Sequence, residues 1–170
     1  MTVEEAIKKR DSVRKFSNQK VETNLVEQIL EAGRLAPTAK NTQPVKIYVL
    51  DSAEAREKLD KATPCRYGAQ TTLLVCGNKE EAWHNDREEY PTAEVDCAII
   101  TTHMMLEATS LGVDTIWIRM FNSSVLREEF NIPDNLTPVV LLNIGYREHD
   151  YVSSPLHTMR KSLNDIVEYK

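Results

Sequence analysis

Arg10, Ser12 and Arg14 lie close together near the start of the chain, within the run Arg-Asp-Ser-Val-Arg. In an extended segment alternate side chains share one face, so these three would project together. Two guanidinium groups and a hydroxyl suit the oxygens of a phosphate monoester, because arginine donates in a planar fork. The alternative is a solvated stretch after an amphipathic helix, and on these five residues alone that alternative is favoured.

A second polar segment, residues 36–44, has the sequence Ala-Pro-Thr-Ala-Lys-Asn-Thr-Gln-Pro. Pro44 fixes the backbone where a strand would begin, while Asn41 and Gln43 can each donate and accept hydrogen bonds. Such a mixture of donors and acceptors suits the edge of a heteroaromatic ring or a polyol chain. Without residues 10–14, an ordinary turn stabilised by asparagine and proline is the better interpretation.

Composition narrows the class of ligand and partner. The net charge of −5 argues against non-specific binding to nucleic acid. The five glycines give neither a GxGxxG spacing nor a glycine-rich loop followed by Lys-Ser or Lys-Thr, so the usual dinucleotide and P-loop fingerprints are absent. No segment approaches the roughly 20 apolar residues of a membrane span, and the N-terminus has no apolar signal core. We therefore expect a cytoplasmic protein with no contact to a membrane.

The three cysteines form no CxxC pair, which predicts neither a disulfide framework nor a metal cluster. Cys76 and Cys97 fall in apolar patterns and are expected in the core. Cys65, between a proline and an arginine, has more scope to react, although an inert thiol is favoured.

The charged segment 79–94 is expected to form a loop or lid. Trp83 and Tyr90 within it are candidates for stacking on a substrate, with a surface role favoured. His84, Asp86 and Glu88 alternate along the same segment, but the absence of a second histidine favours a solvated loop, and we predict no metal site.

Apolar residues at helical spacing, together with capping residues, predict helices over residues 3–9, 22–35, 53–61, 95–111 and 124–130, with a short one around 163–167. Short apolar and β-branched runs predict strands over residues 47–50, 71–76, 114–118 and 139–144. Strands separated by helices indicate a two-layer or three-layer α/β arrangement. Because no repeat or linker interrupts the pattern, we expect one domain over residues 1–170.

The motifs, and the order in which they follow one another along the chain, resemble those of the FMN-dependent nitroreductase family. Residues 10–14 follow a first helix, and residues 36–44 come next. Residues 95–118, VDCAIITTHMMLEATSLGVDTIWI, resemble the family's long central helix and the strand after it. Residues 132–146, IPDNLTPVVLLNIGY, resemble its last core strand, and residues 155–161, PLHTMRK, resemble its basic tail.

The resemblance implies an α/β (α+β) fold, a three-layer sandwich with a mixed, mainly antiparallel central sheet flanked by helices. It also implies a homodimer with FMN at the subunit interface. Residues 147–170 would then form a C-terminal tail that packs on the partner subunit.

The family's functional residues map onto this chain in three groups. The flavin phosphate and ribityl chain would be held by Arg10, Asp11, Ser12, Arg14, Arg160 and Lys161. The loop that lines the flavin ring, contributed largely across the dimer interface, would consist of Pro37, Thr38, Ala39, Asn41 and Gln43. The segment whose backbone contacts the ring near its reactive nitrogen would be Trp117, Ile118, Arg119 and Met120.

Some positions depart from the family pattern. Asp11 stands where an arginine is common, so its side chain should point away from a phosphate and leave only its backbone to contribute. Thr38 and Ala39 replace a frequent serine pair, and Val45 replaces a frequent tryptophan. Arg119 replaces a frequent glycine or acidic residue, and we hypothesise that it stabilises negative charge on reduced flavin.

The resemblance implies an oxidoreductase that passes hydride from NAD(P)H through bound FMN to an electron-poor acceptor, such as a nitroaromatic or a quinone, by a ping-pong mechanism. The flavin supplies the redox chemistry, so no catalytic side chain is assigned. Three alternatives stay open: an FMN-binding protein without NAD(P)H turnover, a flavin-dependent relative of the dehalogenase type, and a flavin-free domain that binds another phosphorylated ligand.

Overall fold

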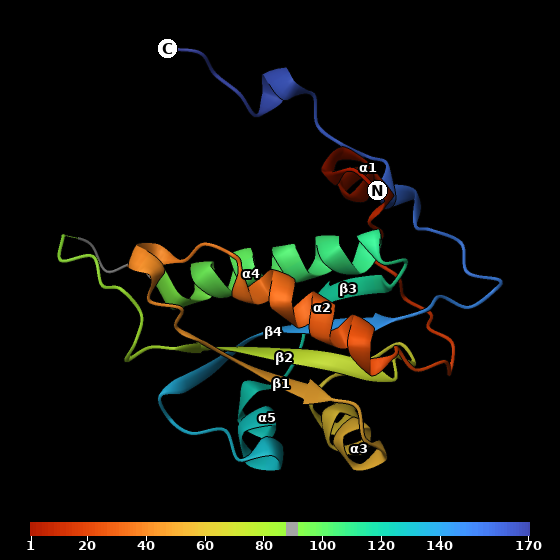
Figure 1. Ribbon diagram of the computed structural model, residues 1–170, viewed down its shortest axis with the longest axis horizontal. Helices are drawn as coiled ribbons and strands as arrows, with labels where there is room; N and C mark the ends of the chain where they lie inside the picture. Colours follow the sequence, from red (N-terminus) through yellow and green to blue (C-terminus); the bar gives the residue numbers. More distant parts are fainter. Residues whose placement is uncertain (88–91) are drawn as a thin grey trace.

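The computed structural model describes residues 1–87 and 92–170, in which helices cover both faces of a central sheet (Figure 1). The four strands run in the order β1-β2-β4-β3, and every neighbouring pair is antiparallel. Their bounds are β1 (Val45–Leu50), β2 (Thr71–Asn78), β3 (Asp114–Ile118) and β4 (Leu136–Gly145). This arrangement confirms the expected three-layer α/β sandwich with a mainly antiparallel sheet.

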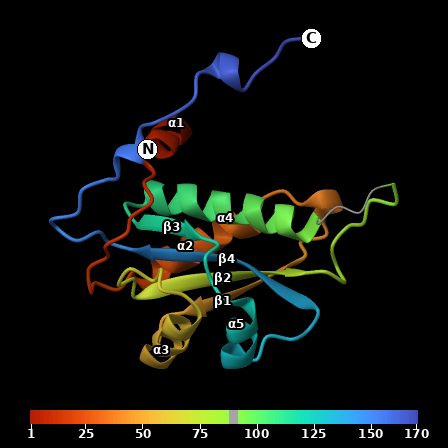
Figure 2. The same ribbon diagram turned by 180° about the vertical axis from the view of Figure 1, so that it is seen from behind.

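Helices pack on the sheet in two pairs (Figures 1 and 2). One face carries α2 (Thr23–Arg34) and α4 (Thr92–Ser110), and the other carries α3 (Ala53–Ala62) and α5 (Ser123–Phe130). The short helix α1 (Val3–Lys9) contacts α4, beside its C-terminal end. None of these helices, within the described part of the chain, is long and apolar enough to cross a membrane.

Strand β2 is buried along its whole length, as its apolar run predicts. Leu73 and Val75 pack in the cluster formed with α2 and α4, whereas Leu74 and Cys76 pack in the cluster formed with α3 and α5. This alternation follows from the two-residue repeat of a strand, which sends successive side chains to opposite faces. The strand therefore joins two separate apolar cores.

Helix α2 approaches α4 closely at Gly33. A Cβ atom at this position would lie 2.7 Å from Cγ of Met104, so a larger residue would have to displace the Met104 side chain. Burial of this contact fixes the spacing between the two helices on that face of the sheet.

Several element ends agree with the sequence signals. Thr2 and Glu5 form the expected capping box of α1, and the hydroxyl of Ser52 accepts the Ala55 amide at the start of α3. Gly112 has a φ of +78°, which ends α4 in a conformation that glycine adopts readily. The last predicted helix is reduced to a 3₁₀ turn over Leu163–Asp165.

Many element boundaries differ from the prediction by one or two residues, and the starts of two elements differ by three. Helix α4 begins at Thr92 rather than Val95, because its first turn is polar and carries no apolar periodicity. Strand β4 begins at Leu136 rather than Val139, although Pro138 cannot donate to a neighbouring strand. The register shifts opposite Val75, so a β-bulge accommodates the proline inside the strand.

Asn143 is a fully buried polar residue of β4 that ties the sheet to the connection between α3 and β2. Its side-chain amide donates to the carbonyl oxygens of Cys65 and Arg66, both at 3.0 Å. Its side-chain oxygen accepts the hydroxyl of Thr72 at 2.7 Å. The amide group of Asn143 thus has protein partners for both its nitrogen and its oxygen.

We predict that Asn143→Leu lowers the free energy of unfolding by about 2–4 kcal/mol, since each buried polar group left without a partner costs about 1–3 kcal/mol. Adding Thr72→Val to this variant should recover part of the loss, because the valine removes the unpaired hydroxyl. Urea denaturation at a fixed protein concentration measures both effects. A loss below about 1 kcal/mol, or no recovery in the double variant, would contradict this assignment.

Candidate functional site

The segment after α1 and the C-terminal tail enclose a small pocket of about 150 Å³. Side chains from both ends of the chain line it: Arg10, Asp11, Ser12, Arg14, Ser154, Leu156, His157 and Arg160. The structure thus brings the arginine cluster of residues 10–14 together with Arg160. Lys161, the next tail residue, is exposed.

Strand β3 positions the arginine cluster. Ser12 forms a parallel bridge with Thr115, and the Val13 amide donates to the Thr115 carbonyl at 3.0 Å. Val13 is completely buried beneath the segment. Because residues 11 and 13 point inward, Arg10, Ser12 and Arg14 share the pocket face, which confirms the extended geometry expected from their spacing.

The pocket is rich in donors. A guanidinium nitrogen of Arg10 donates to Oγ of Ser12 at 3.2 Å, and one of Arg14 donates to the Ser12 carbonyl at 3.1 Å. Arg160 donates to the carbonyl of Met159 at 2.6 Å. Within residues 1–87 and 92–170, no carboxylate lies in ion-pair range of these three arginines. Most of their donors therefore remain available to an anion.

Asp11 is the acidic member of the pocket, and its carboxylate is paired elsewhere. It accepts the hydroxyl of Ser153 and lies 3.7 Å from Nη1 of Arg147 and 3.6 Å from Nδ1 of His157. The carboxylate thus faces tail residues and pairs with none of Arg10, Arg14 and Arg160.

The loop at residues 37–43 is held by its own side chains and by α4. Oγ1 of Thr38 accepts the Gln43 amide at 3.0 Å, and the Gln43 side chain donates to the Asn41 carbonyl at 3.2 Å. Oδ1 of the buried Asp96, in α4, accepts the Ala39 amide at 3.0 Å. Sequence reasoning did not select Asp96, although an acidic residue among the apolar residues of a helix was a usable signal.

Backbone strain is concentrated in this loop. Lys40, Asn41 and Gln43 all have positive φ, with values of 49°, 58° and 52°. Non-glycine residues adopt this region rarely, and clusters of them persist where the surroundings impose the conformation. Lys40 also places its ammonium group 5.6 Å from the ring of Trp83, so the two segments contact each other.

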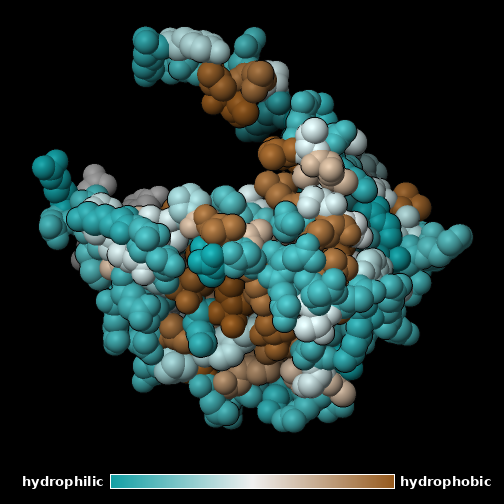
Figure 3. Space-filling model, viewed as in Figure 1, coloured by the Kyte–Doolittle hydropathy of each residue, from teal (hydrophilic) through white to brown (hydrophobic). Residues whose placement is uncertain are grey.

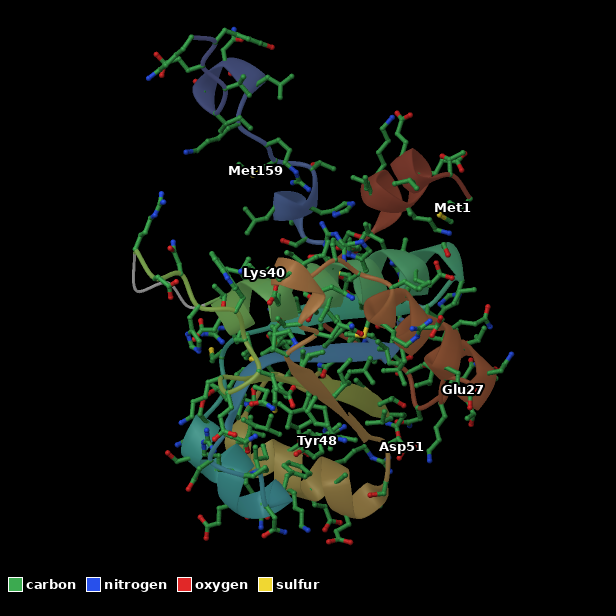
Figure 4. All side chains as sticks on the ribbon, turned by 60° about the vertical axis from the view of Figure 1, so that its left-hand side comes forward. Met1, Glu27, Lys40, Tyr48, Asp51 and Met159 are labelled. Carbon is green, nitrogen blue, oxygen red and sulfur yellow. The ribbon has the colours of Figure 1, made fainter. Side chains whose placement is uncertain are left out.

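The loop and the arginine pocket lie at opposite ends of α4. Asp96 holds the loop in the first turns of the helix, whereas Thr109 and Gly112 line a second cavity together with Arg10. Thirteen residues of helix separate Asp96 from Thr109, which corresponds to about 20 Å. Figure 4 shows Lys40 beside the first part of α4 and Met159 on the tail, which rises away from the body of the molecule. Within a single chain, the loop at residues 37–43 and the arginine pocket therefore do not form one site.

The third group of predicted residues consists of the last two residues of β3 and the two residues after it. Trp117 packs against the α2–α4 core and Ile118 is buried. The Arg119 guanidinium donates to the Val139 carbonyl, and the hydroxyl of Thr63 donates to the Met120 carbonyl at 2.6 Å. Thr115 lies beside Ser12, and Arg119 is four residues further along an extended chain, which corresponds to a distance of about 13 Å. Strand β3 therefore leads from the arginine pocket to residues 117–120.

The remaining candidates contribute less. Tyr90 and Glu88 lie outside the described residues, and in the described part of the chain no three metal-ligating side chains come together. All three cysteines are buried. Burial raises the pKa of the Cys76 and Cys97 thiols to about 12, so both stay protonated at neutral pH.

This fold and pocket define a class: an α/β sandwich with a small arginine-lined pocket at the edge of its sheet. The family model described as "Nitroreductase family" matches residues 7–67 and 63–146, and the chain belongs to this family.

Known relatives cover most of the chain. A curated protein of Methanothermobacter thermautotrophicus, provisionally named an NADH dehydrogenase/NAD(P)H nitroreductase, is 30% identical over 86% of this chain and 78% of its own length. A nitroreductase family protein of Clostridium difficile 630 has a TM-score of 0.93 and 37% identity, with 100% of this chain and 99% of that chain covered. A protein of Exiguobacterium sibiricum, provisionally named a nitroreductase and crystallised in complex with FMN, has a TM-score of 0.84 and 24% identity, with 100% and 98% covered.

We predict that Asp96→Ala loosens the loop of residues 37–43, because the Ala39 amide loses its acceptor. Hydrogen exchange at that amide should accelerate on the order of tenfold, as expected for one lost hydrogen bond. Asp96→Asn keeps an acceptor oxygen and should exchange like the unmodified protein. Equal acceleration in both variants, or in neither, would show that this hydrogen bond does not hold the loop.

Proposed function

We propose that this chain is an FMN-dependent oxidoreductase that takes hydride from NAD(P)H and delivers it to an electron-poor acceptor, such as a nitroaromatic or a quinone. The observation that carries the proposal is the pocket formed by Arg10, Arg14 and Arg160, whose guanidinium groups have no carboxylate partner among the described residues. Family membership and the FMN complex of the Exiguobacterium protein support it.

The donor set and size of the pocket fit the phosphate end of FMN. Its volume of about 150 Å³ is smaller than the roughly 300 Å³ at which sites for whole drug-sized ligands begin. The arginines supply forked donors and Ser12 a hydroxyl, which together match phosphate oxygens. We therefore assign Arg10, Ser12, Arg14 and Arg160 to the phosphate, with the backbone of Asp11 beside them.

The last two residues of β3 and the two residues after it are assigned to the ring end of the flavin. Residues 117–120 lie along the same strand as the phosphate pocket and are fixed by Thr63 and Val139. When bound, FMN supplies the hydride and electron transfer, and the protein supplies binding, orientation and charge. The proposed ping-pong kinetics follow from one site being used in turn by NAD(P)H and by the acceptor.

We further propose that the loop at residues 37–43 reaches this site from a second copy of the chain. Helix α4 leaves an apolar groove of about 460 Å³, lined by Glu94, Val95, Ala98, Ile99, Thr102 and His103. The tail exposes large apolar side chains, namely Val152, Leu156, Met159, Leu163 and Ile166. Figure 3 shows this apolar surface on a tail that stands away from the sheet. Exposed apolar surface of this kind is typical of subunit interfaces.

The purified protein should be yellow and release a cofactor with the mass of FMN. Anaerobic addition of NADH or NADPH should bleach the flavin spectrum, because the proposed enzyme accepts hydride. A yellow protein that neither nucleotide bleaches would be a flavin-binding protein without turnover. A colourless protein that takes up no added FMN would instead favour another phosphorylated ligand, and would contradict the proposal.

Val95→Glu tests the subunit interface. Val95 is 38% exposed in the single chain, so the substitution spares the core but places a charge in the α4 groove. Analytical ultracentrifugation should show a monomer, and bound FMN should be lost with the dimer. The matched control is Val49→Glu on β1, where the valine is 41% exposed. This control should change neither the oligomeric state nor the amount of bound FMN. A monomer that keeps its FMN would contradict a shared site.

A further inference from the structure

The carboxylate of Asp11 is buried at the point where the two ends of the chain meet. Its side chain is only 3% exposed, and the hydrogen-bond and ion-pair partners of its carboxylate belong to the tail. The hydroxyl of Ser153 donates to Oδ2, which also lies 3.7 Å from Nη1 of Arg147, while Oδ1 lies 3.6 Å from Nδ1 of His157. One side chain thus contacts the tail at three positions.

These contacts secure the part of the tail that precedes Arg160. Arg147 is fixed in turn by Asp114, whose Oδ1 accepts from its Nε at 3.0 Å, and it lies 5.3 Å from the ring of Tyr151. The hydroxyl of Tyr151 donates to the Ser12 carbonyl at 3.2 Å. Beyond His157 the tail is exposed through to its last residue. Asp11 therefore contacts the last residue before the tail leaves the body of the molecule.

We infer that Asp11 is a positioning residue, which holds the tail so that Arg160 completes the phosphate pocket with Arg10 and Arg14. The inference rests on the proposed function and adds a role for the side chain that stands where an arginine is common. It explains how an acidic residue can line an anion pocket. Its charge is directed at Arg147 and His157, and the arginines of the pocket are left to the ligand.

Charge alone makes the opposite prediction. A carboxylate next to a phosphate site repels the ligand, so its removal should tighten FMN binding. If the carboxylate positions Arg160, its removal should weaken binding of the phosphate although one negative charge is lost. The sign of the change therefore separates the two accounts.

The test compares FMN with riboflavin, which lacks the phosphate, on full-length protein stripped of flavin. Asp11→Asn keeps an acceptor for Ser153 but loses the negative charge that attracts Arg147. We expect the Kd for FMN to rise about tenfold and the Kd for riboflavin to stay constant, as for a coupling that acts through the phosphate alone. Glu54→Gln is the matched control, because it removes an equal charge from an exposed pair with Lys58 on α3, away from the tail, and should change neither Kd.

Ser153→Ala provides a second variant in case Asp11→Asn folds poorly, since it removes one donor to the carboxylate and leaves the buried charge in place. Ser153→Ala should also reduce the preference for FMN over riboflavin, by a smaller factor than Asp11→Asn. Tighter FMN binding in Asp11→Asn, an unchanged preference, or equal weakening of both flavins would overturn the inference. Unmodified protein that binds neither flavin would overturn the proposed function itself.

Discussion

Helix α4 is the element on which the rest of the structure depends. Its apolar residues surround the helix, so it requires cover on more than one side. Cys97, Ile100 and Met104 are buried against the sheet and α2, where Gly33 permits the close approach. Val95 stays partly exposed on another side. The length of the same helix separates the loop held by Asp96 from the pocket near Thr109. Helix α4 therefore determines both the packing of the core and the distance between these two parts of the chain.

Strand β3 is the second determinant, because it orders the site along one line. The backbone of residues 12 and 13 pairs with Thr115, which fixes the arginine cluster beside the strand. Residues 117–120 include the last two residues of the same strand and the two that follow. As an edge strand, β3 has backbone groups that no other strand of the sheet satisfies. The N-terminal segment pairs with them, and this pairing protects the edge while it presents Arg10 and Arg14.

Local patterns were enough to predict most elements and the common face of Arg10, Ser12 and Arg14, because strand and helix periods report which side of a segment is buried. They could not show that Pro138 lies inside β4, since the bulge that accommodates it depends on the partner strand. Nor could they pair Asp11 with Ser153 and His157, which are distant in the sequence and meet only through the topology. The resemblance to the family selected the site residues, whereas the partners that fix them had to come from the structure.

The pocket joins two segments of unequal stability. Residues 10–14 rest on buried Val13 and on β3, whereas Arg160 belongs to an exposed tail that is attached through the contacts preceding it. An anion that touches both segments favours the state in which the tail is docked. By linkage, whatever docks the tail raises the affinity for the anion by the same factor. On the proposed function, in which a second copy of the chain covers the exposed apolar residues of the tail, flavin binding and subunit association should favour each other, because Arg160 takes part in both.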